Sequence, residues 1–93
     1  MRRIMNRKET ENYFFNRVQK HLDNGFNFDE HTFDSIINEL EQKNVEYAPI
    51  TWEELKDMLI YFEWNYCECE DSIVTDEYAK KIGLINEDDY GNY

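Results

Sequence analysis

The fold of this chain is decided by the stretch that reads Thr51-Trp-Glu-Glu-Leu-Lys-Asp-Met-Leu-Ile-Tyr-Phe-Glu-Trp-Asn-Tyr-Cys-Glu-Cys-Glu-Asp71. Thr51 and Glu54 have the spacing of a capping box, in which each side chain accepts a hydrogen bond from the backbone N–H of the other residue. Apolar residues then recur at spacings of three and four, the period of one helix face. They are Trp52, Leu55, Leu59, Phe62, Tyr66 and Cys69. The stretch predicts one helix of about five turns with a core-facing stripe.

Acidic and aromatic residues recur with the same period on another face of this predicted helix. They are Asp57, Tyr61, Trp64, Glu68 and Asp71. Carboxylates four residues apart would lie about 6 Å apart along the helix axis, close to the spacing of phosphates along a nucleic-acid strand. The alternation of apolar and acidic residues from Tyr66 to Glu70 is also typical of a strand. We favour a continuous helix, because no turn residue other than Asn65 interrupts the run.

Three further helices are predicted by start and stop signals in the rest of the chain. The residues expected to cap their starts are Asn6, Asp29 and either Ser72 or Thr75, and the residues expected to end them are Gly25, Asn44 and Gly83. Pro49 keeps the residue before it out of the helical region, so the segment 45–50 is expected to be extended.

The fold class expected from these signals is a mainly α domain, a small bundle of about four helices over residues 1–85. A short strand or hairpin near 45–50 or 64–70 is the alternative to helix and loop there. The first five residues are expected to be loosely docked, and residues 86–93 to form an acidic disordered tail. The expected core consists of Phe14, Val18, Leu22, Phe33, Ile36, Ile37, Leu40, Leu55, Leu59 and Phe62.

Charge is distributed unevenly along a chain whose formal net charge is −11. Residues 1–20 hold six basic and two acidic residues, whereas residues 21–93 hold nineteen acids, four lysines and no arginine. Phosphate binding needs cations, so the acidic part is not expected to bind nucleic acid or an anionic membrane. The basic N-terminus, with Arg2, Arg3, Arg7 and Lys8, could contact nucleic acid or pair with acids of its own chain. We favour the second interpretation.

Tests for catalytic and metal sites give no candidate. An EF-hand register that places Gly25 at loop position 6 puts Lys20 at position 1 and His31 at position 12, where the loop needs carboxylates. Cys67 and Cys69 form one ligand pair where structural zinc needs two. No Gly-rich phosphate loop and no serine elbow is present. We therefore expect no metal, no cofactor and no enzymatic activity, and reduced cysteines in a cytoplasmic protein without a membrane span.

In its small size, its excess of acids and its lack of motifs, the whole chain resembles the small acidic nucleic-acid-mimicking inhibitors of phages and mobile elements, anti-CRISPR proteins among them. The resemblance implies a stoichiometric inhibitor that occupies the basic cleft of a CRISPR effector or another nuclease in the host cytoplasm. From the charge pattern, the expected partner-binding residues are Glu53, Asp57, Tyr61, Glu63, Trp64, Glu68, Glu70 and Asp71.

The alternative function is that of a non-enzymatic adaptor or accessory protein. Such a protein would dock a partner through an aromatic patch, and its acids would serve only solubility and the association rate. Salt separates the two functions, because screening weakens a charge-driven complex much more than a hydrophobic one.

Overall fold

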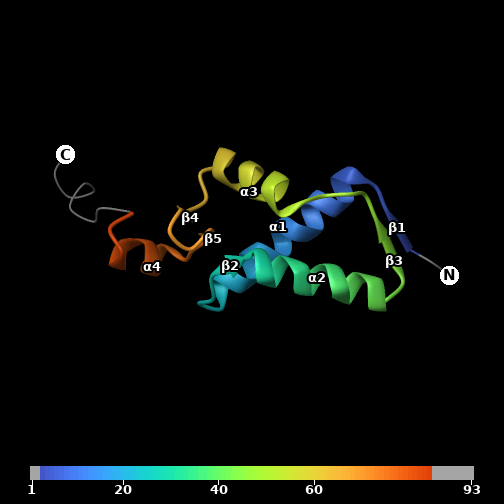
Figure 1. The fold of residues 1–93 in the computed structure, drawn as a ribbon, viewed down its shortest axis with the longest axis horizontal. Helices are drawn as coiled ribbons and strands as arrows, with labels where there is room; N and C mark the ends of the chain where they lie inside the picture. The colour runs from blue at the N-terminus through green and yellow to red at the C-terminus, as the bar shows by residue number, and fades with distance from the viewer. Residues whose placement is uncertain (1–2, 85–93) are drawn as a thin grey trace.

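A computed structural model describes residues 3–84, which form four helices and five short strands (Figure 1). The helices are α1 (Arg7–Asp23), α2 (Glu30–Gln42), α3 (Trp52–Tyr61) and α4 (Asp76–Lys81). The strands are β1 (Arg3–Met5), β2 (Phe28–Asp29), β3 (Val45–Tyr47), β4 (Tyr66–Cys67) and β5 (Ser72–Ile73). The predicted four helices are present, but the strands pair into two small sheets, so a pure helix bundle is confirmed only in part. The predicted tail over 86–93 lies outside the described residues.

Each helix begins at a residue whose side chain accepts a hydrogen bond from its first turn. Asn6 with Glu9, and Thr51 with Glu54, form complete capping boxes. The other two start residues are Asp29, which accepts from the backbone N–H of Thr32, and Thr75, which accepts from that of Tyr78. Local side-chain chemistry therefore sets where the helices start, as the sequence predicts.

The predicted helix over 51–71 is wrong, because α3 ends at Tyr61. Glu63 follows the cap residue with a φ of 67°, in the left-handed region. The backbone N–H of Glu63 donates to the carbonyl of Ile60 at 2.9 Å, and that of Trp64 to the carbonyl of Leu59 at 3.0 Å. These two bonds are the Schellman pattern that satisfies the last carbonyls of a helix. The other helices end as predicted, with left-handed Gly25, Asn44 and Gly83.

The chain after α3 forms a β-hairpin, which is the alternative that the sequence leaves open for 64–70. β4 pairs with β5 in antiparallel register, with Cys67 opposite Ser72, and β2 adds to the other side of β5. The loop of the hairpin runs over residues 68–71, and Asp71 closes it with a φ of 49°. The alternating run from Tyr66 to Glu70 therefore covers the short strand β4 and most of the hairpin loop, and none of it is helical.

A second sheet joins β1 and β3 in parallel at the opposite end of the long axis (Figure 1). The predicted strand within 45–50 is confirmed at Val45–Tyr47. The expectation that the first residues are loosely docked is wrong for residues 3–5, because they pair with this strand and the Met5 side chain is buried.

The core lies among α1, α2 and α3 and is organised by aromatic rings. Phe14 of α1 stacks on Phe33 of α2 at a centroid distance of 4.9 Å, and Phe28 and Phe33 contact Trp52 of α3 at 6.0 and 6.1 Å. Of the ten predicted core residues, seven are buried, namely Phe14, Val18, Phe33, Ile36, Leu40, Leu55 and Leu59. Leu22 and Ile37 are half-buried. Phe62 is 58% exposed, because α3 ends at Tyr61 and the core-facing side of the helix does not extend to Phe62.

Candidate partner-binding surface

Asp71, expected on the binding surface, holds the hairpin to α3. Its carboxylate accepts hydrogen bonds from the Tyr66 hydroxyl at 2.6 Å, the Trp52 indole N–H at 3.1 Å and the Lys56 ammonium at 3.2 Å. These donors, Tyr66 first, hold the pKa of Asp71 below its ordinary value. Asp71 is thus bound by three groups of its own chain, and because α3 ends at Tyr61 it does not share a helix face with Asp57. The predicted helical stripe is wrong at this position, whereas the role of Asp71 in partner binding stays a prediction.

Glu53 is likewise tied to its own helix. Its carboxylate lies 2.9 Å from the ammonium of Lys56, which also contacts Asp71 and lies 5.4 Å from the centre of the Tyr66 ring. The hydrogen bond to Glu53, together with Asp71, raises the pKa of Lys56. The charge that Glu53 offers to a partner is thus partly compensated.

The hairpin loop presents Glu68, Cys69 and Glu70 at the surface. Glu70 accepts a hydrogen bond from the Tyr78 hydroxyl of α4, which raises the pKa of Tyr78, and its Oε2 lies 3.8 Å from the Sγ of buried Cys67. Glu68 has no such contact among the described residues. The two glutamates therefore differ, since Glu70 is anchored to α4 and Glu68 is available to a partner.

The acids that the structure leaves exposed and without an ion pair, within residues 3–84, are spread over both halves of the chain. Those of the second half include Asp57 on α3, Glu63 in the turn after it, Glu68 in the hairpin loop and Glu77 on α4. On α2 they are Glu30, Asp34 and Glu41. No single helix face connects the expected stripe, but three successive elements carry its charges.

Among the described cations of the first half, the arginines Arg7 and Arg17 pair with acids of the same chain, whereas Lys8 and Lys20 are exposed without an ion pair. Arg7 pairs with Glu11 at 2.8 Å and with Glu54 at 3.0 Å, which raises the pKa of its guanidinium. Arg17 pairs with Glu39 at 3.2 Å. The preferred interpretation of the basic N-terminus is thus confirmed for Arg7 but not for Lys8, which has no ion pair within residues 3–84. The side chains of Arg2 and Arg3 lie outside the described part of the chain.

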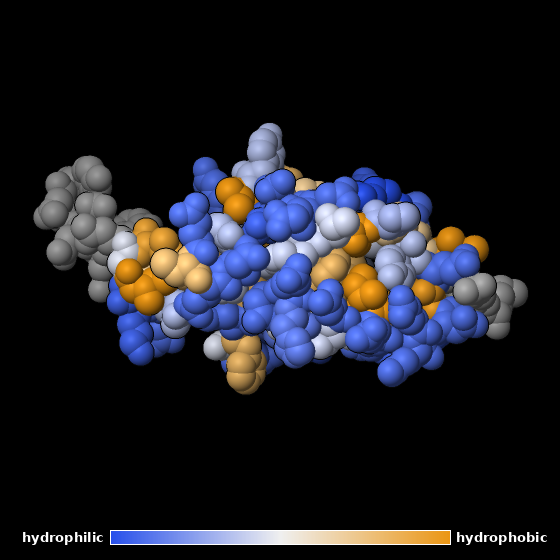
Figure 2. All heavy atoms as spheres, viewed as in Figure 1, coloured by the Kyte–Doolittle hydropathy of each residue, from blue (hydrophilic) through white to orange (hydrophobic). Residues whose placement is uncertain are grey.

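Hydrophobic side chains are exposed where α3 ends. Ile60 is 42% exposed, Tyr61 80% and Phe62 58%, and the Phe62 ring contacts that of Phe15 edge-on at 6.0 Å. We call Ile60, Tyr61 and Phe62 the α3-end patch. Figure 2 shows a mostly hydrophilic face on which hydrophobic side chains gather in separate groups rather than one band.

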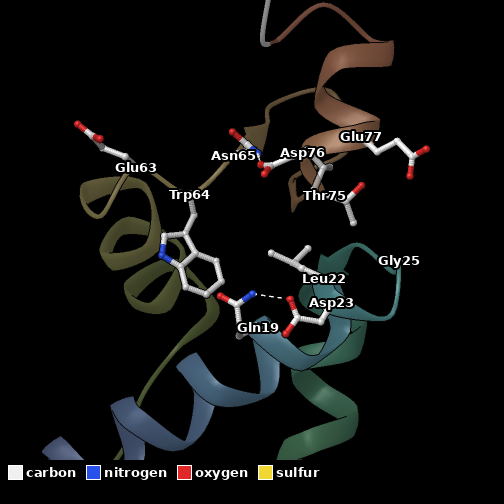
Figure 3. Close-up of a pocket in the computed structure, with 11 residues that line it drawn as sticks. Gln19, Leu22, Asp23, Gly25, Glu63, Trp64, Asn65, Thr75, Asp76 and Glu77 are labelled. Atoms are coloured by element: carbon white, nitrogen blue, oxygen red, sulfur yellow. Dashed lines mark hydrogen bonds between the residues drawn. The ribbon is translucent and has the colours of Figure 1, made fainter. Parts of the chain in front are cut away.

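Trp64 lies half-buried at a hollow of about 490 Å³ between the end of α1, the turn after α3 and the start of α4 (Figure 3). Among the described residues, the hollow is lined by the four carboxylates of Asp23, Glu63, Asp76 and Glu77 and by no lysine, arginine or histidine. In Figure 3 the indole points into the space between the elements, whereas Glu63 and Glu77 point away from it. The hollow combines an aromatic ring with uncompensated negative charge.

The sequence pattern selected two of the five acidic and aromatic residues of this hollow, Glu63 and Trp64, although it placed them on a helix. It missed Asp23, Asp76 and Glu77, which come from α1 and α4 and are brought to Trp64 only by the packing of those helices. No periodicity connects residues so far apart, and the abundance of acids in the sequence hides any particular pair.

Comparison with protein-family models, with curated proteins and with solved structures finds no match for this chain. Within residues 3–84, no cluster of three or more His, Cys, Asp and Glu side chains has the geometry to hold a metal ion. None of the helices in this range has the length and apolarity needed to cross a membrane. The function is therefore inferred from the geometry and charge of the chain itself.

Proposed function

We propose that this protein binds the basic cleft of a nucleic-acid-binding protein or nuclease, such as a CRISPR effector, and inhibits it by occupying that cleft in place of DNA or RNA. It acts in the cytoplasm by binding alone, without a cofactor or a catalytic step. This is the activity expected of a phage-type acidic inhibitor.

The observation that carries this proposal is the excess of exposed acids over exposed cations among the residues without an ion pair. Arg7, Arg17 and Lys56 are held in ion pairs within the chain. Within residues 3–84, Lys8 and Lys20 are exposed without an ion pair, but acids in that condition, Asp57 and Glu68 among them, outnumber such lysines. An unneutralised acidic surface attracts a basic cleft over several ångströms and accelerates association. The support is charge rather than phosphate-like spacing, because the helix that would have provided that spacing ends at Tyr61.

The test begins with the immobilised protein and a nuclease-treated lysate of the host cell. The retained protein is identified and purified, and its binding to labelled DNA or RNA is measured with increasing amounts of the acidic protein. We expect competition that weakens steeply as salt is raised. A retained protein that binds no nucleic acid, or keeps it bound throughout, contradicts the proposal.

A pair of charge-reversal variants locates the surface. Asp57→Lys combined with Glu68→Lys should abolish competition, because like charges then face each other across the contact. Glu30→Lys combined with Asp34→Lys makes the same change in net charge on α2 and should leave competition nearly intact. Both pairs change exposed residues, so each substitution should alter the free energy of unfolding by less than about 0.5 kcal/mol. Equal losses from the two pairs would show that only net charge matters.

The α3-end patch favours a second function, docking of a partner through exposed rings. Tyr61 at 80% exposure is a suitable anchor, because aromatic residues dominate the binding energy of interfaces. In this case Tyr61→Ser should abolish capture of the partner while Asp57→Lys with Glu68→Lys has little effect, and capture should persist at high salt. The two functions therefore predict opposite results from the same variants.

A further inference from the structure

The hollow at Trp64 concentrates negative charge at one point of the surface. Asp23 accepts a hydrogen bond from the side-chain amide of Gln19 at 2.7 Å, and Asp76 accepts one from the side-chain amide of Asn65 at 2.6 Å. Both donors are neutral, so neither carboxylate charge is compensated. Glu63 and Glu77 add two further charges at the rim.

The carboxyl ends of two helices add to the negative electrostatic potential at the hollow. α1 ends at Asp23 and α3 ends at Tyr61, both beside the hollow. The carboxyl end of a helix carries a partial negative charge of about half an elementary charge. The start of α4 also meets the hollow, and its partial positive charge is covered by Asp76 and Glu77 in its first turn. A cation is thus favoured here by side chains and backbone together.

The indole of Trp64 makes the hollow selective for a flat organic cation. The side chain is half-buried and lines the hollow beside the apolar side chains of Leu22 and Val74. A guanidinium group stacks on an indole face and bonds carboxylates through two parallel N–H donors, whereas an ammonium is a compact, strongly hydrated charge. The volume of about 490 Å³ falls within the range of roughly 300–1,000 Å³ that is usual for ligand pockets.

We infer that this hollow receives the guanidinium group of an arginine from the basic surface of the partner, stacked on Trp64 and bonded to Asp23 and Asp76. This inference rests on the proposed function and extends it, because it specifies one arginine socket within a charged interface. The arginine side chain then fixes how the two proteins are oriented against each other, which long-range attraction alone leaves undefined.

The test is an NMR titration of the ¹⁵N-labelled full chain with a short peptide of alternating glycine and arginine. We expect the indole N–H signal of Trp64 and the amide signals of Asn65 and Thr75 to shift in a saturable way, while the indole signal of Trp52 stays in place. A peptide with citrulline, the neutral counterpart of arginine, should cause no shift, and a lysine peptide should bind several-fold more weakly. An unmoved Trp64 signal overturns the inference without the use of any variant.

Two matched double variants separate the socket from general electrostatics. Asp23→Asn with Asp76→Asn keeps both amide hydrogen bonds and should weaken arginine-peptide binding by at least about tenfold, since bonds to charged groups are lost. Asp57→Asn with Glu68→Asn removes the same charge outside the hollow and should weaken it by less than about threefold. Equal weakening in the two variants, or none in the first, overturns the socket.

The results also distinguish this inference from the proposed function. If the peptide binds at Trp64 but the protein never competes with nucleic acid on its partner, the proposed function fails and the socket stands. If competition is strong but Asp23→Asn with Asp76→Asn competes as well as the parent and the peptide leaves Trp64 unmoved, the socket fails and the proposed function stands.

Discussion

At the scale of single residues, Asp71 determines how the chain folds after α3. Its backbone is in the left-handed region, with a φ of 49°. An aspartate tolerates that conformation better than most residues, because its short side chain forms local hydrogen bonds. Its carboxylate binds Trp52 and Lys56 of α3 and Tyr66 of β4. One acidic side chain thus fixes both the turn and its docking on the core.

Removal of this carboxylate is expected to destabilise the protein, although glycine adopts the left-handed backbone of position 71 with less strain than aspartate does. Asp71→Gly should lower the free energy of unfolding by about 1–3 kcal/mol, because the N–H of buried Trp52 loses its acceptor. Asp71→Asn keeps an acceptor oxygen and should cost less than Asp71→Gly. Urea melts of the three proteins at pH 7 measure the difference, and equal stability of parent and Gly variant would contradict the structural role.

The same residue predicts a pH dependence. The pKa of Asp71 is lowered in the folded state, whereas an aspartate in an unfolded chain has a pKa of about 3.9. The contribution of its charge to stability is therefore complete above that unfolded pKa and is lost as the pH falls through the lower folded pKa. The stability difference between the parent and Asp71→Asn should shrink in urea melts taken from pH 7 down to pH 2. A constant difference would show that the charge contributes nothing.

At the scale of elements, the end of α3 is set by a residue that is not typical of that position. Glu63 occupies the place that Gly25 and Gly83 fill at the ends of α1 and α4. A left-handed non-glycine residue costs about 1–2 kcal/mol, and other contacts must offset that cost. The half-buried ring of Trp64, which packs against the core, and the pairing of β4 with β5 both require the turn.

Glycine at this position is expected to stabilise the protein. Glu63→Gly removes the backbone strain, and the added freedom of the unfolded chain cancels about 0.5–1 kcal/mol of that gain. The free energy of unfolding should rise by up to about 1 kcal/mol. Asp57→Gly, in the interior of the same helix, is the control and should lower it by about 0.3 kcal/mol, because glycine has a lower helix propensity than aspartate. Destabilisation by Glu63→Gly in thermal and urea melts would mean that the glutamate side chain itself holds the turn.

At the scale of the whole molecule, one core links three helices, the β1–β3 sheet lies at one end of the long axis, and the β2–β5–β4 sheet lies between these helices and α4 (Figure 1). Leu59 lies in that core with no exposed surface, while the next residue, Ile60, is 42% exposed in the α3-end patch. Consecutive residues of one helix thus have separate roles, one in folding and one at the surface.

This difference gives a test of the packing. Leu59→Ala should lower the free energy of unfolding by about 2–5 kcal/mol, because it leaves a cavity among packed side chains. Ile60→Ala should change it by no more than about 0.5 kcal/mol, because the site is largely solvated. Both values come from urea melts of the single variants, and similar costs at the two positions would mean that α3 faces the core differently.

The sequence by itself determined three of the four helix starts, narrowed the fourth to Ser72 or Thr75, and determined three of the four helix ends and most of the core. Asn6, Asp29, Thr51 and Thr75 cap helices through hydrogen bonds to residues three positions away. Glycine at positions 25 and 83 adopts a backbone that few other residues accept. Each of these signals acts within one turn of the chain, so a local pattern is enough to reveal it.

Only the tertiary structure decided where α3 ends, how the two sheets pair and which acids meet at Trp64. β5 pairs with β2 across more than forty residues, and β1 pairs with β3 across a similar distance. The turn at Glu63 and the bonds to Asp71 form because those pairings and the burial of Trp52 stabilise them jointly. A helical period in the sequence indicates only the local preference of one segment for helix. In the segment after Tyr61, contacts with distant segments outweigh that preference.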